Sequence, residues 1–112
     1  KRENIVLTFH PKLAPILVAV FPLLSNKQEL TKKARDVFNM LKEEFSCFYD
    51  ASGSIGRRYS RQDEVGTPFC ITIDFDSLTQ QDVTIRLRDT TEQKRVKTRE
   101  LSQNIRDCIG KT

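Results

Sequence analysis

Apolar and polar positions along the chain predict five strands separated by helices and turns. Residues 16–21 are continuously apolar and end at a proline, which is typical of a strand buried on both faces. Residues 47–49 predict a second, short strand. Single-residue alternation of apolar and polar side chains predicts two more strands over 69–75 and 83–88, and residues 94–97 predict a fifth.

Three helices are predicted between and after these strands. Apolar side chains recur every three or four positions over residues 30–45, with charged side chains outside the stripe. Asn26 and Glu29 form a variant of the capping box at the start of this helix. Residues 54–65 predict a polar helix that ends at a glycine and a proline, and residues 101–109 predict the last helix.

The element order predicts an α/β fold with a mixed sheet. Strands separated by helices favour a parallel core, whereas the fourth and fifth strands form an antiparallel hairpin. We therefore expect a five-stranded mixed β-sheet, with a parallel core plus an antiparallel hairpin, flanked by three α-helices. Residues 1–15 contain two prolines and are expected to be a lead-in or linker from an upstream domain, and residues 16–112 form the predicted domain.

The composition is that of one globular domain. The chain has 112 residues, of which 38% are hydrophobic and 30% charged. Its longest apolar run, residues 13–24, contains two prolines and is too short to span a bilayer, so we expect no membrane association. Cys47, Cys70 and Cys108 are odd in number and widely spaced, which indicates reduced core residues. A cytoplasmic protein is therefore expected, with a mitochondrial form as the alternative.

Excess positive charge is concentrated near the predicted hairpin. The net charge is +4, and residues 86–99 hold six lysines and arginines against Asp89 and Glu92. Such a surplus favours an anionic partner. Arg86 and Arg88 have the same strand parity, so they share one face of the sheet. Together with the two carboxylates they offer donors and acceptors to nucleobase edges, although cross-strand ion pairs explain the spacing equally well.

A second basic group follows a glycine turn at the start of the predicted 54–65 helix. Arg57, Arg58 and Arg61 lie there, interleaved with Tyr59. Arginine side chains and free N–H groups at a helix start favour phosphate. The alternative is a solvated helix face with salt bridges.

Few residues suggest catalysis. The chain has one histidine and contains neither a GxSxG nucleophile elbow nor a Walker A loop. Asp74 and Asp76 close a predicted strand and could suggest a divalent ion, but without a third ligand a solvated strand end is favoured. We expect no catalytic, cofactor-binding or metal-binding residue in this chain.

Three segments carry a resemblance to a known family. They are KLAPILVAVFPLL (residues 12–24), DASGSIGRRYSRQDEVGTPFCITIDFDSL (50–78) and VTIRLRDTTEQKRV (83–96). In this order they closely resemble the C-terminal anticodon-binding domain of the dimeric, class IIa glycyl-tRNA synthetases. That family's fold, a five-stranded mixed sheet with three helices, agrees with the element order derived above.

The resemblance implies recognition of glycine tRNA through its anticodon, whose last two letters are both cytosine. Cytosine presents an amino donor beside O2 and N3 acceptors, so reading it requires both an acceptor and a donor from the protein. The expected nucleic-acid-binding residues are Arg57, Arg58, Arg61, Arg86, Arg88, Asp89, Glu92 and Gln93.

The hairpin departs from the family pattern at two positions. The family usually has Arg-Asp-Arg-Asp-x-Met, whereas this chain has Leu87 at the second position and Thr91 at the methionine position. The role of the first aspartate therefore cannot be carried over. Because Leu87 has the parity of Val83 and Ile85, it is expected to pack inward.

The resemblance places catalysis elsewhere. It implies a parent enzyme, a homodimer, that binds ATP and Mg in an upstream catalytic domain, while this chain itself is non-catalytic. An alternative of a different class is a non-catalytic accessory or interaction protein that reuses the anticodon-binding fold. A small enzyme of another type is disfavoured, because the chain lacks a nucleophile–base pair.

Overall fold

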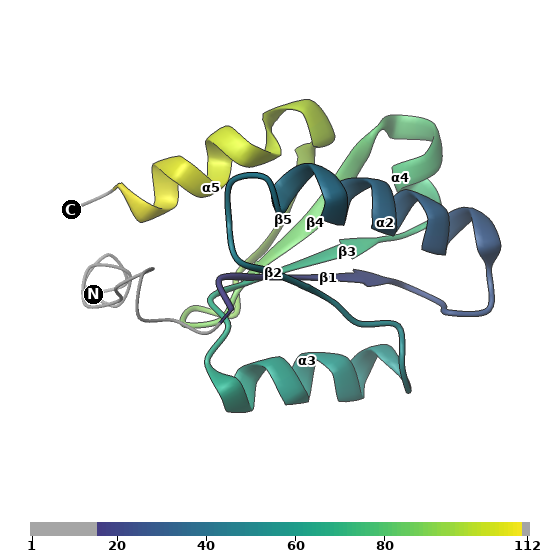
Figure 1. Ribbon diagram of the computed structural model, residues 1–112, viewed down its shortest axis with the longest axis horizontal. Coiled ribbons are helices and arrows are strands. Elements are labelled where there is room, and N and C mark those ends of the chain that lie inside the picture. Colours follow the sequence, from purple (N-terminus) through teal and green to yellow (C-terminus); the bar gives the residue numbers. More distant parts are fainter. Residues whose placement is uncertain (1–15, 111–112) are drawn as a thin grey trace.

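A mixed sheet of five strands organises the fold in the computed structural model, which describes residues 16–110 (Figure 1). The strand order is β2-β1-β3-β4-β5. β1 pairs in parallel with β2 and β3, whereas β3–β4 and β4–β5 are antiparallel. The predicted parallel core and antiparallel hairpin are thus confirmed, and the expected lead-in, residues 1–15, lies outside the described residues. The strands are β1 (Val18–Pro22), β2 (Cys47–Tyr49), β3 (Phe69–Ile73), β4 (Asp82–Leu87) and β5 (Gln93–Lys97).

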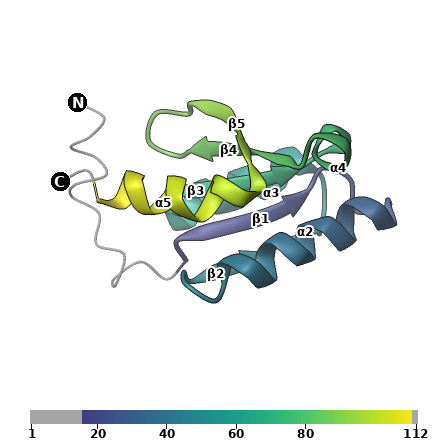
Figure 2. The same cartoon turned by 90° about the horizontal axis from the view of Figure 1, so that it is seen from above.

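Helices cover the two faces of the sheet unequally. The helices are α2 (Gln28–Leu41), α3 (Ile55–Val65), α4 (Phe75–Gln80) and α5 (Leu101–Ile109), with a 3-10 turn η1 (Thr98–Glu100) before α5. Figure 1 shows α2 and α5 on one side of the sheet and α3 alone on the other, and Figure 2 shows α2 and α5 side by side across the first of these faces. The three predicted helices are α2, α3 and α5.

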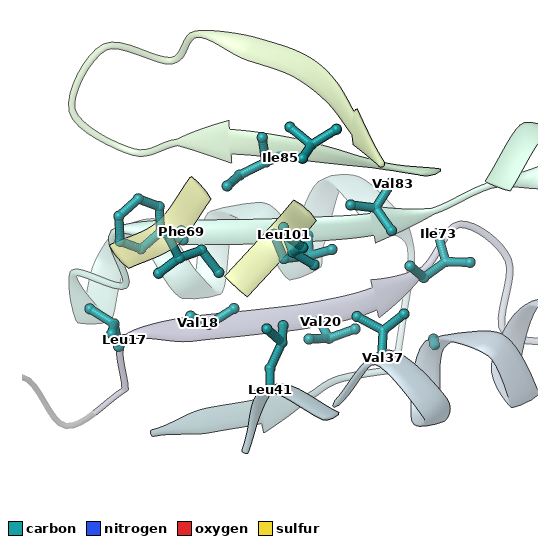
Figure 3. Packing of buried hydrophobic residues seen from close by; sticks show 14 of the residues in the cluster. Leu17, Val18, Val20, Val37, Leu41, Phe69, Ile73, Val83, Ile85 and Leu101 are labelled. Carbon is teal, nitrogen blue, oxygen red and sulfur yellow. The ribbon is translucent and has the colours of Figure 1, made fainter. Parts of the chain in front are cut away.

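The main core lies between the sheet and the α2/α5 layer (Figure 3). Val18 and Val20 of β1 point into it, whereas Ala19 and Phe21 point to the opposite face and pack with Cys70 against α3. Because both faces of β1 are covered, all five of its residues are buried, as the continuous apolar run predicts.

The cysteines are free in the described part of the chain and contribute to packing. Cys70 is buried, and Cys47 and Cys108 are half-buried against the main core. Burial raises the pKa of the Cys70 thiol to about 12 and that of Cys47 to about 11, so both stay protonated at neutral pH. The predicted reduced state agrees with these environments.

The first predicted helix differs from the observed one at both ends. Lys27, in an extended conformation, is the N-cap of α2, and its side chain makes no capping hydrogen bond. The predicted cap at Asn26 is therefore wrong by one residue, because apolar periodicity fixes the buried face of a helix but not its terminal residue. The helix ends at Leu41, and Phe45 packs against the core from the turn that follows.

A short helix, α4, was not predicted. The alternating pattern extended the third strand to residue 75, but β3 ends at Ile73. The Asp74 carboxylate accepts a hydrogen bond from the Ser77 N–H at 3.1 Å, and the Ser77 hydroxyl accepts one from the Asp74 N–H at 3.0 Å. This reciprocal capping box starts α4 and leaves Phe75 45% exposed.

Asp74 also belongs to an ion-pair network at the base of the β4–β5 hairpin. The Arg95 guanidinium contacts both Asp74 oxygens at 2.9 Å, and its Nη2 contacts Asp82 at 2.6 Å. Asp74 is thus paired with Arg95 rather than being a solvated strand end. Among residues 16–110, no group of three histidine, cysteine or acidic side chains is placed to hold a metal ion. Hydrogen bonding to Arg95 lowers the pKa of Asp74 to about 2 and also lowers the pKa of Asp82.

We expect Arg95→Met to flatten the acid dependence of stability. Depressed carboxylate pKa values add stability that is complete above the unfolded value near pH 4 and is lost as the pH falls toward 2. Because the network is partly exposed, each carboxylate should contribute on the order of 1 kcal/mol at neutral pH. The measurement is the free energy of unfolding in urea between pH 7 and pH 2.

The matched control is Lys94→Met, which removes one positive charge from an exposed neighbouring position on the same strand. Lys94→Met should keep the wild-type pH profile. Parallel pH profiles for Arg95→Met and the wild type would contradict the assignment of this stability to Arg95.

Candidate nucleic-acid interface

The start of α3 is built by a glycine turn and a serine cap. Gly53 adopts a left-handed conformation with φ of 73°, which a side chain would disfavour. Ser54 then caps the helix, and its hydroxyl accepts a hydrogen bond from the Arg57 N–H at 3.3 Å. This confirms the predicted glycine turn, at Gly53, whereas Gly56 already lies within α3.

Arg58 differs from its neighbours on α3, because its side chain is buried and only 1% of the residue is exposed. Its Nε donates to the Ser52 carbonyl at 3.3 Å, Nη2 donates to the Gly53 carbonyl at 2.9 Å, and Nη1 donates to the Pro22 carbonyl. Arg58 thus ties α3 to the end of β1 and to the preceding loop. The expectation that Arg58 binds phosphate does not fit this geometry, because its guanidinium is enclosed by backbone acceptors.

Arg61 and Arg57 are more accessible. Arg61 donates to the Asp50 carboxylate at 2.8 Å and to the Ser52 carbonyl at 2.7 Å, and its side chain is 43% exposed. Burial raises the pKa of Asp50, but hydrogen bonds from Arg61 and Ser52 outweigh this effect and hold it below the ordinary value. Arg57 is exposed, and its side chain forms no hydrogen bond or ion pair with any residue of the described range 16–110. Arg57 is therefore the most available cation of the three.

Arg86 of β4 lies on the face of the sheet that α3 partly covers. It pairs in register with Cys70 on one side and with Gln93 on the other. Its Nη1 contacts the Asp63 carboxylate at 3.2 Å, and its guanidinium lies 4.9 Å from the centre of the Tyr59 ring. With 16% of its side chain exposed, Arg86 is held between helix and sheet and is partly accessible to solvent.

Arg88 continues this arrangement toward the hairpin tip. Its Nε donates to the backbone carbonyl of Asp63 at 3.1 Å, and its Nη1 contacts the Asp89 carboxylate at 3.3 Å. Its side chain is 41% exposed. The predicted common face of Arg86 and Arg88 is confirmed, and their ion pairs are made with α3 and with a sequence neighbour rather than across the hairpin.

Glu92 is set apart from this group. The Leu87 N–H donates to the Glu92 carbonyl at 2.9 Å, which extends the β4–β5 register by one pair beyond Arg86 and Gln93. Leu87 packs against the main core, as predicted from its parity. Glu92 is opposite Leu87 and therefore has the parity of the core side of the hairpin, whereas Gln93 has the parity of Arg86. The turn that separates the strands holds Thr91 at φ of 56°, a left-handed conformation that is uncommon for a β-branched residue.

Two separate groups therefore emerge from the predicted site residues. The loop cluster around Arg58 and Arg61 joins α3 to the sheet, whereas a second group surrounds the exposed edges of Arg86 and Arg88. We call this second group the hairpin cluster: Tyr59, Asp63, Arg86, Arg88, Asp89 and Gln93.

Sequence reasoning missed Asp63. Its spacing of four residues from Tyr59 places both on one face of α3, which was the available signal. The pattern could not tell which strand that face would meet, because the distance to Arg86 depends on how α3 packs.

The hairpin cluster combines guanidinium donors, carboxylate acceptors and an amide on one accessible surface, which is the chemistry of a nucleobase-reading surface. A family model described as an anticodon binding domain matches residues 17–107, and this chain belongs to that family. In the described part of the chain, no helix is long and apolar enough to cross a membrane.

Three similar relatives are glycine–tRNA ligases. The chain is 53% identical over 104 residues to the glycine–tRNA ligase of Clostridium kluyveri, which covers 93% of this chain and 22% of the relative. It is 54% identical over 104 residues to the glycine–tRNA ligase of Treponema denticola, covering 93% of this chain and 23% of the relative. The enzyme of the same name from Rhodopirellula baltica is 56% identical over 92 residues, which are 82% of this chain and 17% of the relative. The chain thus spans about a fifth of the length of the relatives it matches.

We expect Arg58→Met to destabilise the fold by about 3 kcal/mol, because the Pro22 and Gly53 carbonyls lose this donor and the Ser52 carbonyl keeps only its hydrogen bond from Arg61. The same change at the exposed neighbour Arg57 should alter stability by about 0.5 kcal/mol or less. Urea unfolding monitored by circular dichroism measures both. Equal unfolding midpoints for the two variants would contradict the structural role of Arg58.

Proposed function

We propose that this chain is the anticodon-binding part of a glycine–tRNA ligase and that it recognises the anticodon of glycine tRNA. The observation that carries the proposal is the match to glycine–tRNA ligases at 53% identity over 93% of the chain. The hairpin cluster supports it independently, because it offers the mixture of hydrogen-bonding groups that a cytosine edge requires.

Different parts of the surface would contribute differently to tRNA binding. The exposed edges of Arg88 and Arg86 and the amide of Gln93 supply donors for O2 and N3 of cytosine, and the carboxylate of Asp89 supplies an acceptor for its amino group. Arg57, exposed at the start of α3 and far in sequence from the hairpin, would contact phosphate without regard to sequence.

The catalytic activity would reside in another part of the parent enzyme. We propose that a separate catalytic domain binds ATP with Mg and charges the tRNA with glycine, that the parent is a homodimer, and that it acts in the cytoplasm. The length of the relatives, of which this chain covers 22% in the Clostridium kluyveri enzyme, leaves room for such a domain. No cofactor is proposed for this chain itself.

We expect Arg88→Ala to erode discrimination between glycine tRNA and a tRNA with a substituted anticodon cytosine, by roughly 1–3 kcal/mol. Arg57→Ala should weaken binding to both tRNAs about equally and reduce the salt slope by about one unit, because it removes one phosphate contact. Both are measured by titration of the 112-residue chain with matched and substituted tRNA at two salt concentrations.

Identical losses from Arg88→Ala and Arg57→Ala on both tRNAs would contradict base reading by the hairpin. If the unmodified chain bound an unrelated tRNA equally well, the surface would bind RNA only by nonspecific electrostatic attraction. A lack of any tRNA binding would instead support an accessory or interaction role for the fold.

A test of activity separates this chain from its proposed parent. We expect the 112-residue chain to catalyse no glycine-dependent exchange between ATP and pyrophosphate, because amino-acid activation is assigned to the separate catalytic domain. Exchange above the background of a heat-denatured sample would place the activation chemistry within this chain and overturn that division.

A further inference from the structure

One residue of α3 contacts both arginines of the hairpin cluster. The Asp63 carboxylate lies 3.2 Å from Arg86 Nη1, and the Asp63 backbone carbonyl accepts a hydrogen bond from Arg88 Nε at 3.1 Å. Asp63 is in the last turn of α3, where a positive charge is favoured. Its backbone carbonyl also accepts a hydrogen bond from the Gly66 N–H at 3.3 Å, so Arg88 uses the second acceptor position of this oxygen. The helix end therefore presents two acceptors, from one residue, to two neighbouring guanidinium groups.

Holding these side chains has an energetic consequence. A free arginine side chain populates many rotamers, and fixing it in one geometry costs conformational entropy. Arg86 is restrained from two sides, by the Asp63 carboxylate and by the Tyr59 ring, and Tyr59 is itself fixed by a hydrogen bond to Thr72 and edge contact with Phe21. A ligand that meets an already ordered guanidinium does not bear that ordering cost.

The remaining donors of both arginines stay available. Arg86 uses one terminal nitrogen for Asp63, and Arg88 uses Nε and one terminal nitrogen for Asp63 and Asp89. Within residues 16–110, Nη2 of each arginine makes no hydrogen bond, and a guanidinium presents its N–H groups in a rigid planar fork.

We propose that Asp63 is a positioning residue for anticodon reading: its carboxylate orients Arg86, and its backbone carbonyl orients Arg88, toward the nucleobases. This inference rests on the proposed function. Asp63 acts through the arginines rather than by touching the tRNA, so its effect should appear in discrimination between anticodons and should depend on Arg86.

The side chain and the backbone of Asp63 can be separated experimentally. Asp63→Ala removes the carboxylate that holds Arg86 but keeps the backbone carbonyl that holds Arg88. The matched control is Glu64→Ala, which removes the same charge from the next residue of α3, an exposed position that contacts neither arginine in the described part of the chain. Removing a negative charge should strengthen binding of every tRNA slightly in both variants, so the readout is the ratio of affinities for glycine tRNA and an anticodon-substituted tRNA.

We expect Asp63→Ala to reduce this ratio about tenfold and Glu64→Ala to leave it unchanged. The Asp63→Ala/Arg86→Ala double variant should discriminate as Arg86→Ala alone does, whereas Asp63→Ala combined with Arg88→Ala should lose more than either single variant. Melting temperatures recorded in parallel identify any loss caused by unfolding, and the ratio is then taken at a temperature where all variants are folded.

The outcomes distinguish the two proposals. Full discrimination by Asp63→Ala, or a further loss when Asp63→Ala is added to Arg86→Ala, would overturn the positioning role, since the second result means that the carboxylate meets the base directly. Failure of the unmodified chain to discriminate would overturn the proposed function itself.

Discussion

The position of α3 depends on a single buried cation. Arg58 donates to the carbonyl of Pro22, the last residue of β1, and to two carbonyls in the loop before the helix. Without them a buried guanidinium would be strongly unfavourable, and without the guanidinium the Pro22 and Gly53 carbonyls would lose this donor. Because α3 is the one described helix on its face of the sheet, this interaction also sets where Tyr59 and Asp63 meet β4.

The two faces of the sheet divide structural and functional roles. The face under α2 and α5 carries an apolar core that extends from β1 to β5. The α3 face has a small apolar cluster around Phe21, and toward the hairpin its side chains become polar, with Arg86 opposite Gln93. A face that one helix covers only partly can keep charged groups ordered and still accessible, which a fully covered face cannot do.

Several arginines of the chain are engaged in contacts within the fold and are less available to bind an anionic partner. Arg58 is enclosed by carbonyls, Arg61 is paired with Asp50, and Arg95 is paired with two carboxylates at the hairpin base. These three arginines therefore contribute to the stability of the fold. Among the arginines predicted to bind nucleic acid, Arg57 is exposed and unpaired within residues 16–110, and Arg86 and Arg88 keep an unbonded Nη2, so these three are the most available to RNA.

The sequence by itself determined the strands, their order along the chain and the parity of the hairpin, because burial imposes a period of two on strands and of 3.6 on helices. The order of the strands within the sheet came from the structure. The sequence placed Arg86 and Arg88 on one face and Leu87 on the other, and its resemblance to the anticodon-binding family agrees with the family match. Only the tertiary structure decided which arginines are available: Arg57 and Arg58 are adjacent and chemically identical, but about 100° of rotation around α3 exposes one and buries the other. The contacts of Asp63 likewise could not be predicted from the pattern of apolar and polar residues. They join segments more than twenty residues apart, and packing sets the distance between these segments.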